Sequence, residues 1–345
     1  MTDLFLAITM MLALNLYALM GGADYGGGVW DLLSFGPNKK AQRELIAGAL
    51  APIWEANHVW LILVIVVLFS AFPPAFAALS VSLHIPLTLL LLGMIFRGTA
   101  FTFRRYDSKK DVTQERWGMI FSISSLFTPI VLGIILGAIT QGHISVNLYN
   151  YGHSHPSAHY SFYDLYVKPW TSPFCFAVGL FALVLFSFLA AVYLSTFAES
   201  EQLKEDFRKR AIVSQFVCAA LALIVFLLAD FYVPPLKEAL LHSSWSAPVQ
   251  AITAVSALSS LYFLFRRRYI WARTAAALQV TFILWGWGLA QYPYLIRPEL
   301  TIQNAAGARS TQELLVFALG FGAFVLIPSF VLLFKVFKHD RDHVV

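Results

Sequence analysis

The stretch PFCFAVGLFALVLFSFLAAVYLSTF, residues 173–197, contains no charged side chain. A helix needs about 20 mostly apolar residues to cross the hydrocarbon core of a bilayer. This stretch is long enough to do so, and similar runs recur before and after it along the chain. We therefore expect an integral membrane protein built of helices.

The composition of the whole chain supports the same class. Of its 345 residues, 59% are hydrophobic and 12% are charged, and the mean hydropathy is +0.69. Soluble domains carry about 25% charged residues, so this chain has too little polar surface for a water-exposed globule. The net charge of +5 does not indicate nucleic-acid binding, because the basic residues form short clusters between apolar runs and make no stripe.

Two short features of the sequence exclude other classes. Cys175 and Cys218 both lie inside apolar runs, so they suggest neither a metal site nor a disulfide framework. The first twenty residues lack a basic segment and an A-x-A cleavage site, which favours a retained first helix over a signal peptide.

Apolar runs of spanning length occur nine times, which predicts an all-α polytopic fold in a single transmembrane domain, 1–345. Two four-helix units with one extra helix are the expected arrangement, although similarity between the halves is too faint to prove a repeat. The runs are 4–23, 50–71, 75–97, 118–140, 173–197, 211–233, 248–265, 274–293 and 313–336.

Lys and Arg residues predict the orientation, because they accumulate on the cytoplasmic side of membrane proteins. With nine spans, 20 of the 24 basic residues fall on one face, and only Lys168, Lys237, Arg297 and Arg309 fall on the other. We expect the N-terminus outside and the C-terminus in the cytoplasm. The basic segments are 39–43, 97–116, 204–210, 266–273 and 335–341.

Glu55 and His58 are the first candidates for function, because ionisable residues inside spans usually face protein, water or a cofactor. If the second helix begins near Leu45, Glu55 lies about 15 Å into it, with His58 on the same face. Such a pair can pass a proton, since burial and mutual contact move both pKa values toward neutrality. Alternatively the helix starts at Pro52, and Glu55 is an interfacial acid in its first turn.

Asp24 lies in GGADYGGG, residues 21–28, which holds five glycines. Glycine there lets the backbone unwind or lets another helix approach closely. Counting from Leu4 places Asp24 near the cytoplasmic boundary. It is therefore equally a candidate proton-entry group and an ordinary interfacial acid.

The histidines give weaker signals. His84 is expected near the middle of the third helix, as a haem ligand, a proton-relay group or a core histidine. The outer loop contains His143, His153, His155 and His159, a composition that can bind metal but more commonly is solvated. No haem-attachment or metalloprotease motif is present, so we expect neither a metal site nor a catalytic residue in this chain.

Four motifs in order resemble subunit II of the cytochrome bd quinol oxidases, including the cyanide-insensitive type. The first predicted helix, 4–23, is followed by GADYGGG at residues 22–28, and the second, 50–71, contains PIWEANHVWL at 52–61. The third, 75–97, leads into RGTAFTFR at 97–104, and the eighth, 274–293, ends in GWGLAQYPYLI at 286–296. The resemblance covers essentially the whole chain.

The resemblance implies a respiratory complex of the bacterial cytoplasmic membrane that oxidises quinol and reduces oxygen to water. A larger subunit I holds haem b and haem d, or a further haem b in place of haem d. Subunit II in this family carries no haem, braces subunit I, can hold a structural quinone and contributes a cytoplasmic proton path. A small third subunit is found in some complexes.

The family motifs carry over residue by residue. The helix-2 motif is usually W-D-G-N-Q, so Glu55 replaces the acid and His58 replaces glutamine, while Trp54 and Asn57 are kept. The resemblance implies a proton path with Glu55 and Asp24. His58 adds a titratable group where many members have none, so it either tunes this path or is a packing choice of one subfamily. The resemblance also implies that Arg97 and Arg104 anchor the inner face, and that Gln291 and Tyr292 pack against a neighbour at the outer face.

Two other functions fit parts of the sequence. A secondary transporter would use Asp24 in a glycine-broken helix as its coupling site, and a second repeat should then hold an acid at the corresponding position. The four predicted helices from 173–197 to 274–293 have no acid in their interior. A membrane cytochrome would bind haem in this chain through His58 and His84.

Overall fold

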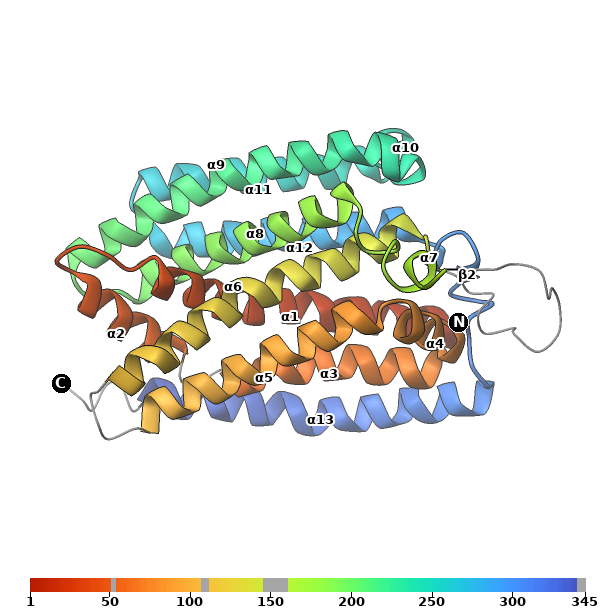
Figure 1. Ribbon diagram of the computed structural model, residues 1–345, viewed down its shortest axis with the longest axis horizontal. Helices are drawn as coiled ribbons and strands as arrows, with labels where there is room; N and C mark the ends of the chain where they lie inside the picture. The colour runs from red at the N-terminus through yellow and green to blue at the C-terminus, as the bar shows by residue number, and fades with distance from the viewer. Residues whose placement is uncertain (51–53, 107–111, 145–160, 340–345) are drawn as a thin grey trace.

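The computed structural model describes residues 1–50, 54–106, 112–144 and 161–339. Long, roughly parallel helices form one elongated bundle, with the N-terminus at one end and the end of the last helix at the other (Figure 1). The elements are α1 (Thr2–Leu32), α2 (Lys39–Leu50), α3 (Trp54–Ala71), α4 (Pro73–Ser82), α5 (His84–Tyr106), α6 (Val112–Gln141), α7 (Phe162–Tyr166), α8 (Pro173–Phe197), α9 (Glu201–Tyr232), α10 (Pro234–His242), α11 (Ser246–Phe265), α12 (Tyr269–Gln291), β1 (Tyr294–Ile296), β2 (Leu300–Thr301) and α13 (Arg309–His339).

The protein is an all-α polytopic membrane protein. Within the described residues, seven helices are long and apolar enough to cross a membrane, or eight if the bent pair α3–α4 counts as one span. Large apolar side chains face outward along the bundle, and Phe231 and Phe324 are 82% and 78% exposed. Such exposure is expected where lipid, not water, surrounds the helices.

Helix α1 lies in the middle of the bundle. It packs against α3, α6 and α8, while α8 also packs against α9 and α12, and α11 packs against α12. Helix α13 contacts α3 and α1 and is otherwise exposed. The long helices therefore form two adjoining groups, α1–α3–α5–α6 and α8–α9–α11–α12, with α13 beside the first (Figure 1).

Capping and proline residues set several helix starts. Ser172 and Ser200 accept hydrogen bonds from the backbone N–H groups of Cys175 and Leu203, so they cap α8 and α9. Proline in the first turn leaves no hydrogen bond unmade, which suits Pro173 at the start of α8.

The predicted third span, 75–97, differs from the structure. Helix α3 ends at Ala71, and α4 turns away from it by 117°. Pro73 follows Phe72, and a residue before proline is disfavoured in the helical conformation, so the chain bends there. The spanning helix is α5, which begins at His84 and continues past Arg104.

The second predicted helix, 50–71, is also preceded by an additional element. The chain from Lys39 to Leu50 forms the separate helix α2, and α3 begins at Trp54. Helix α2 lies at the same end of the bundle as the end of α13 (Figure 1). The short connections α4, α7 and the hairpin β1–β2 lie at the opposite end, near the N-terminus (Figure 1).

The antiparallel hairpin β1–β2 pairs Tyr294 with Thr301 and Ile296 with Leu300. The α11–α12 turn and the start of α9 share the end where α2 lies (Figure 1). The described basic segments therefore cluster at one end of the bundle, as the predicted orientation requires. The orientation in the membrane stays a prediction.

Candidate functional site

A buried ion pair joins α1 to α5. Asp24 is 1% exposed and Arg97 is 2% exposed. The Nη2 atom of Arg97 lies 2.5 Å from Oδ1 of Asp24, and its Nε donates to the hydroxyl of Ser125 at 3.1 Å. The guanidinium also lies 4.6 Å from the centre of the Tyr25 ring. A buried charge needs this kind of partnership, because an unpaired one is strongly disfavoured.

A second pair repeats the arrangement seven residues further along both helices. Asp31 is fully buried, and its two oxygens accept from Nη1 and Nη2 of Arg104, each at 3.1 Å. Seven residues are nearly two turns, or about 10 Å, so both acids lie on nearly the same side of α1. Arg97 and Arg104 therefore form two successive ion pairs that join α5 to α1.

Asp31 was not among the residues singled out from the sequence. A signal was present, because the D-x6-D spacing in 24–31 matches the R-x6-R spacing in 97–104. Arg97 is buried against Asp24, and its role as an inner-face anchor stays a prediction. Arg104 is closer to that expectation, because its side chain is 20% exposed.

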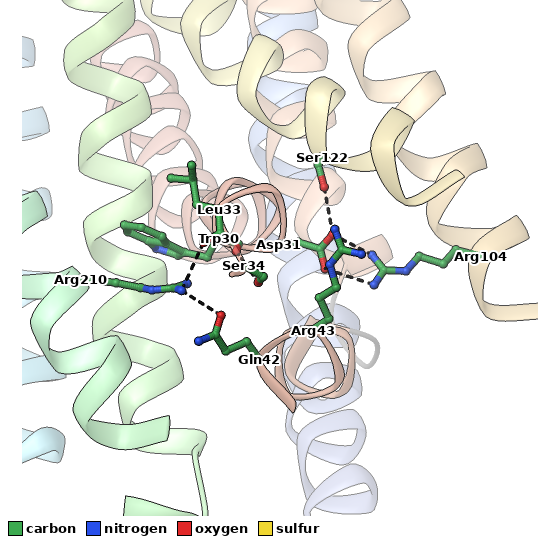
Figure 2. Close-up of polar contacts among 9 residues, drawn as sticks. All are labelled: Trp30, Asp31, Leu33, Ser34, Gln42, Arg43, Arg104, Ser122 and Arg210. Carbon is green, nitrogen blue, oxygen red and sulfur yellow. Dashed lines mark hydrogen bonds and ion pairs between the residues drawn. The ribbon is translucent and has the colours of Figure 1, made fainter. Parts of the chain in front are cut away.

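Two serines of α6 form hydrogen bonds with these two ion pairs. Ser122 donates to Oδ2 of Asp31 at 3.0 Å, and Ser125 accepts from Arg97. From α2, Nε of Arg43 lies 3.8 Å from Oδ1 of Asp31 (Figure 2). Asp31 is thus surrounded by two guanidinium groups and one hydroxyl.

Asp24 has a different surrounding. Its Oδ1 pairs with Arg97, but Oδ2 makes no hydrogen bond within the described part of the chain. A carboxylate oxygen can accept a proton or a hydrogen bond, and a buried one without a partner usually indicates water, a ligand or a transient proton. Asp24 therefore keeps one buried oxygen without a described partner, whereas both oxygens of Asp31 accept hydrogen bonds.

Aromatic and polar groups surround Asp24. The hydroxyls of Tyr17 and Tyr25 lie 3.1 Å apart, and the ring of His58 lies 6.5 Å from that of Tyr17. His58 also interacts electrostatically with Arg97 and Asp24. Asn57 is fully buried and donates to the carbonyl of Met20 at 3.4 Å. The structure thus brings the predicted residues Asp24, His58 and Asn57 together.

Glu55 and Trp54 lie in the first turn of α3, and their side chains are outside the described part of the structure. The described part of α3 begins at Trp54, and the depth of Glu55 in the membrane stays a prediction. The backbone places Glu55 one turn before His58, and their contact stays a prediction.

The glycine run of α1 is a close-packing surface. Helix α1 is continuous from Thr2 to Leu32, so the glycines do not unwind it. A Cβ at Gly26 would collide with the backbone carbonyl of Phe186, and one at Gly28 would collide with Ser125. Glycine therefore lets α8 and α6 approach α1 beside Asp24, and the broken helix that the transporter hypothesis requires does not occur here.

Helix α2 is attached to the bundle on two sides (Figure 2). On one side Arg43 reaches Asp31. On the other, Arg210 of α9 donates to Oε1 of Gln42 at 2.9 Å and to the carbonyl of Leu33 at 3.3 Å, with its guanidinium 5.2 Å from the Trp30 ring. These contacts hold α2, the helix that precedes Glu55 in the chain, against α1 and α9.

The histidine predictions have different outcomes. His84 is exposed at the start of α5, where its ring contacts Tyr166 at 4.9 Å, so its expected place in mid-helix was wrong. The physical reason is the α3–α4 bend, which moves residue 84 to the end of the bundle. His58 lies beside Tyr17 of α1, whereas His84 lies beside Tyr166 of α7. His153, His155 and His159 lie outside the described residues, and the described residues contain no cluster of three or more metal-binding side chains.

Gln291 and Tyr292 lie at the end of α12 away from α2. Gln291 is 5% exposed, and neither atom of its amide has a partner among the described residues. Tyr292 is 58% exposed and follows the last turn of the helix. The packing of Tyr292 and Gln291 against a neighbouring subunit stays a prediction.

A mostly apolar cavity of about 610 Å³ lies between α1, α6, α8, α9, α11 and α12. Gln215 and Gln279 line it, each 4% exposed, and the side-chain oxygen of each lacks a partner among the described residues. Pockets of about 300–1,000 Å³ with a few polar groups are typical of small-molecule sites. The cavity can hold an apolar molecule with a hydrogen-bonding head group.

Comparison with known proteins identifies relatives along the whole chain. The family model for "Cytochrome bd terminal oxidase subunit II" matches residues 2–337. The chain is 26% identical to cytochrome bd-I ubiquinol oxidase subunit 2 of Escherichia coli (strain K12), over 92% of this chain and 88% of that protein. It is 29% identical to cytochrome bd ubiquinol oxidase subunit 2 of Bacillus subtilis (strain 168), over 53% of each.

A solved structure shares the fold. A chain of the bd oxidase from Geobacillus thermodenitrificans superposes with a TM-score of 0.78 at 23% identity, covering 98% of this chain and 99% of that one.

Proposed function

The chain belongs to the cytochrome bd terminal oxidase subunit II family, and from this premise we propose that it supports a haem-bearing subunit I and supplies it with protons. The complex oxidises quinol, reduces oxygen to water and builds a proton motive force in the bacterial cytoplasmic membrane. Relatives that are named as ubiquinol oxidase subunits support this assignment. The haems belong to subunit I, and a small third subunit completes some complexes of this kind.

The observation that carries the proton path is the free oxygen of Asp24. It is buried beside Arg97, the Tyr17–Tyr25 hydroxyl pair and His58. Protons enter at the Glu55 turn, pass His58 and reach Oδ2 of Asp24. Arg97 holds the carboxylate in place through Oδ1, which leaves Oδ2 as the atom that accepts the proton.

Asp31 and Arg104 have a supporting role. Both oxygens of Asp31 accept hydrogen bonds from Arg104, and Oδ2 also accepts one from Ser122. It holds α5 and α2 against α1, and so positions Arg97 and the start of α3 (Figure 2).

The apolar cavity is the proposed site of a structural quinone. The side-chain oxygens of Gln215 and Gln279, which have no partner in the described part of the chain, fit the hydroxyl groups that the head group carries in its reduced, quinol form, and the apolar lining fits an isoprenoid tail. A bound quinone here would brace the two helix groups. Tyr17 also lines this cavity, so the quinone and proton sites adjoin each other.

Glu55→Gln tests the path. The substitution keeps the size of the side chain but replaces the carboxyl group with an amide, which cannot take up and release a proton. We therefore expect turnover of the assembled complex to fall by about 100-fold, the lower end of the range for a positioned proton-transfer group. Oxygen consumption per haem is the measurement, with saturating quinol. Haem content and subunit ratio should not change.

Glu44→Gln is the matched control. Glu44 lies on α2, and its side chain is 69% exposed, so its loss should leave turnover unchanged. Normal turnover in an assembled Glu55→Gln complex would remove Glu55 from the path.

A further inference from the structure

Three consecutive arginines form the turn between α11 and α12. Arg266 is the C-cap residue of α11, Arg268 is the N-cap residue of α12, and all three side chains are exposed. The turn lies at the end of the bundle where α2 lies (Figure 1). A dense patch of guanidinium groups therefore sits where two membrane helices emerge.

Nearby acids do not neutralise this patch. Glu205 is the closest, 3.6 Å from Nη2 of Arg267. It is already bound on both oxygens by Arg208, with distances of 2.5 and 2.8 Å. Arg266 and Arg268 have no ion pair within the described ranges of the chain. The turn therefore keeps an excess of positive charge.

The backbone of the turn is unusual. Arg267 has φ = +57°, and it is the one described non-glycine residue in this left-handed region. Glycine adopts this conformation without steric penalty, whereas an L side chain does not. This conformation ends α11, because the backbone N–H groups of Arg267 and Arg268 donate to the carbonyls of Leu264 and Phe263 in the pattern of a Schellman motif, and it holds the three arginines in one tight turn.

Aromatic side chains surround the arginines. Tyr262, Phe265 and Trp271 are 55%, 60% and 58% exposed, and the Arg266 guanidinium lies 5.6 Å from the centre of the Tyr262 ring. Exposed Tyr and Trp concentrate at the depth of lipid head groups. The arginines therefore lie at the level of the lipid phosphates.

We propose that Arg266, Arg267 and Arg268 form a binding site for the head group of an anionic phospholipid. Arginine suits this ligand, because its planar fork binds phosphate oxygens in pairs. The acyl chains would run along the exposed apolar side chains of the two helices, such as Ile270 and Leu258, which are 64% and 67% exposed.

The test is lipid binding to the purified complex. Delipidated complex is titrated with phosphatidylglycerol or phosphatidylcholine, and bound lipid is counted by native mass spectrometry. Each basic residue near an anionic surface contributes about 1 kcal/mol, or roughly fivefold. Arg266→Gln/Arg268→Gln should weaken phosphatidylglycerol binding by about 25-fold and leave phosphatidylcholine unchanged. Arg309→Gln, at the opposite end and 87% exposed, is the control and should change neither.

A second variant separates binding from folding. Arg267→Gly removes both the charge and the backbone strain, so thermal stability should rise or hold while phosphatidylglycerol affinity falls about fivefold. Unchanged phosphatidylglycerol affinity in both variants would overturn the site. So would an equal loss of both lipids, or displacement of the lipid by an equal concentration of inorganic phosphate.

Discussion

Asp24 and Asp31 lie on the same helix, and each is bound by an arginine of α5, yet their carboxylates have different surroundings. Asp31 is saturated by Arg104, Ser122 and Arg43, whereas Asp24 keeps one oxygen without a described partner. A saturated carboxylate anchors cations, and a partly bonded one can take part in proton exchange. We therefore propose that Asp24 belongs to the proton path and that Asp31 supports it.

Replacing Asp24 tests this assignment. Asp24→Asn leaves the buried Arg97 without a counter-charge, which should destabilise the subunit by about 3–5 kcal/mol. Asp24→Asn/Arg97→Gln removes both charges and should recover most of that loss, measured as thermal unfolding of the purified complex. Turnover per haem should stay low in the double variant. A double variant with normal turnover would exclude Asp24 from proton transfer.

At the scale of elements, the glycine face of α1 sets how closely three helices approach. Gly26→Ala should destabilise the subunit by about 1–3 kcal/mol, because the new methyl group meets the backbone of α8, which cannot rotate away. Gly320→Ala on α13 meets open space and should be neutral or slightly stabilising. Thermal unfolding of the two variants gives the comparison, and an equal effect would contradict this packing role.

Sequence reasoning located the spanning helices because the bilayer requires long apolar runs, such as 173–197. The bend between α3 and α4 could not be predicted, because residues 75–97 are apolar on both sides of Leu83. A hydropathy profile shows how apolar a segment is, but not in which direction its helix runs. Sequence reasoning brought Asp24, His58 and Asn57 forward because polar groups are rare in spans. Asp31 escaped notice because an acid near a helix end is common, and only its contact with α5 distinguishes it.

At the scale of the whole molecule, the distribution of basic residues predicts the orientation. Lys40 and Arg309 lie at opposite ends of the bundle, and their side chains are 85% and 87% exposed. A membrane-impermeant maleimide added to intact cells should label Arg309→Cys and spare Lys40→Cys. The native Cys175 and Cys218 are buried and should give little background. Labelling of Lys40→Cys alone would reverse the orientation.

We propose that this chain is the subunit of a quinol oxidase that does not itself hold the haems. The most direct measurement is purification in mild detergent through a tag on this chain, followed by a reduced-minus-oxidised spectrum and mass identification of the co-purifying chains. We predict haem bands that accompany a larger membrane subunit and disappear when this chain is separated from it. Haem that stays with the isolated chain, or a preparation with neither haem nor partner, would contradict the claim.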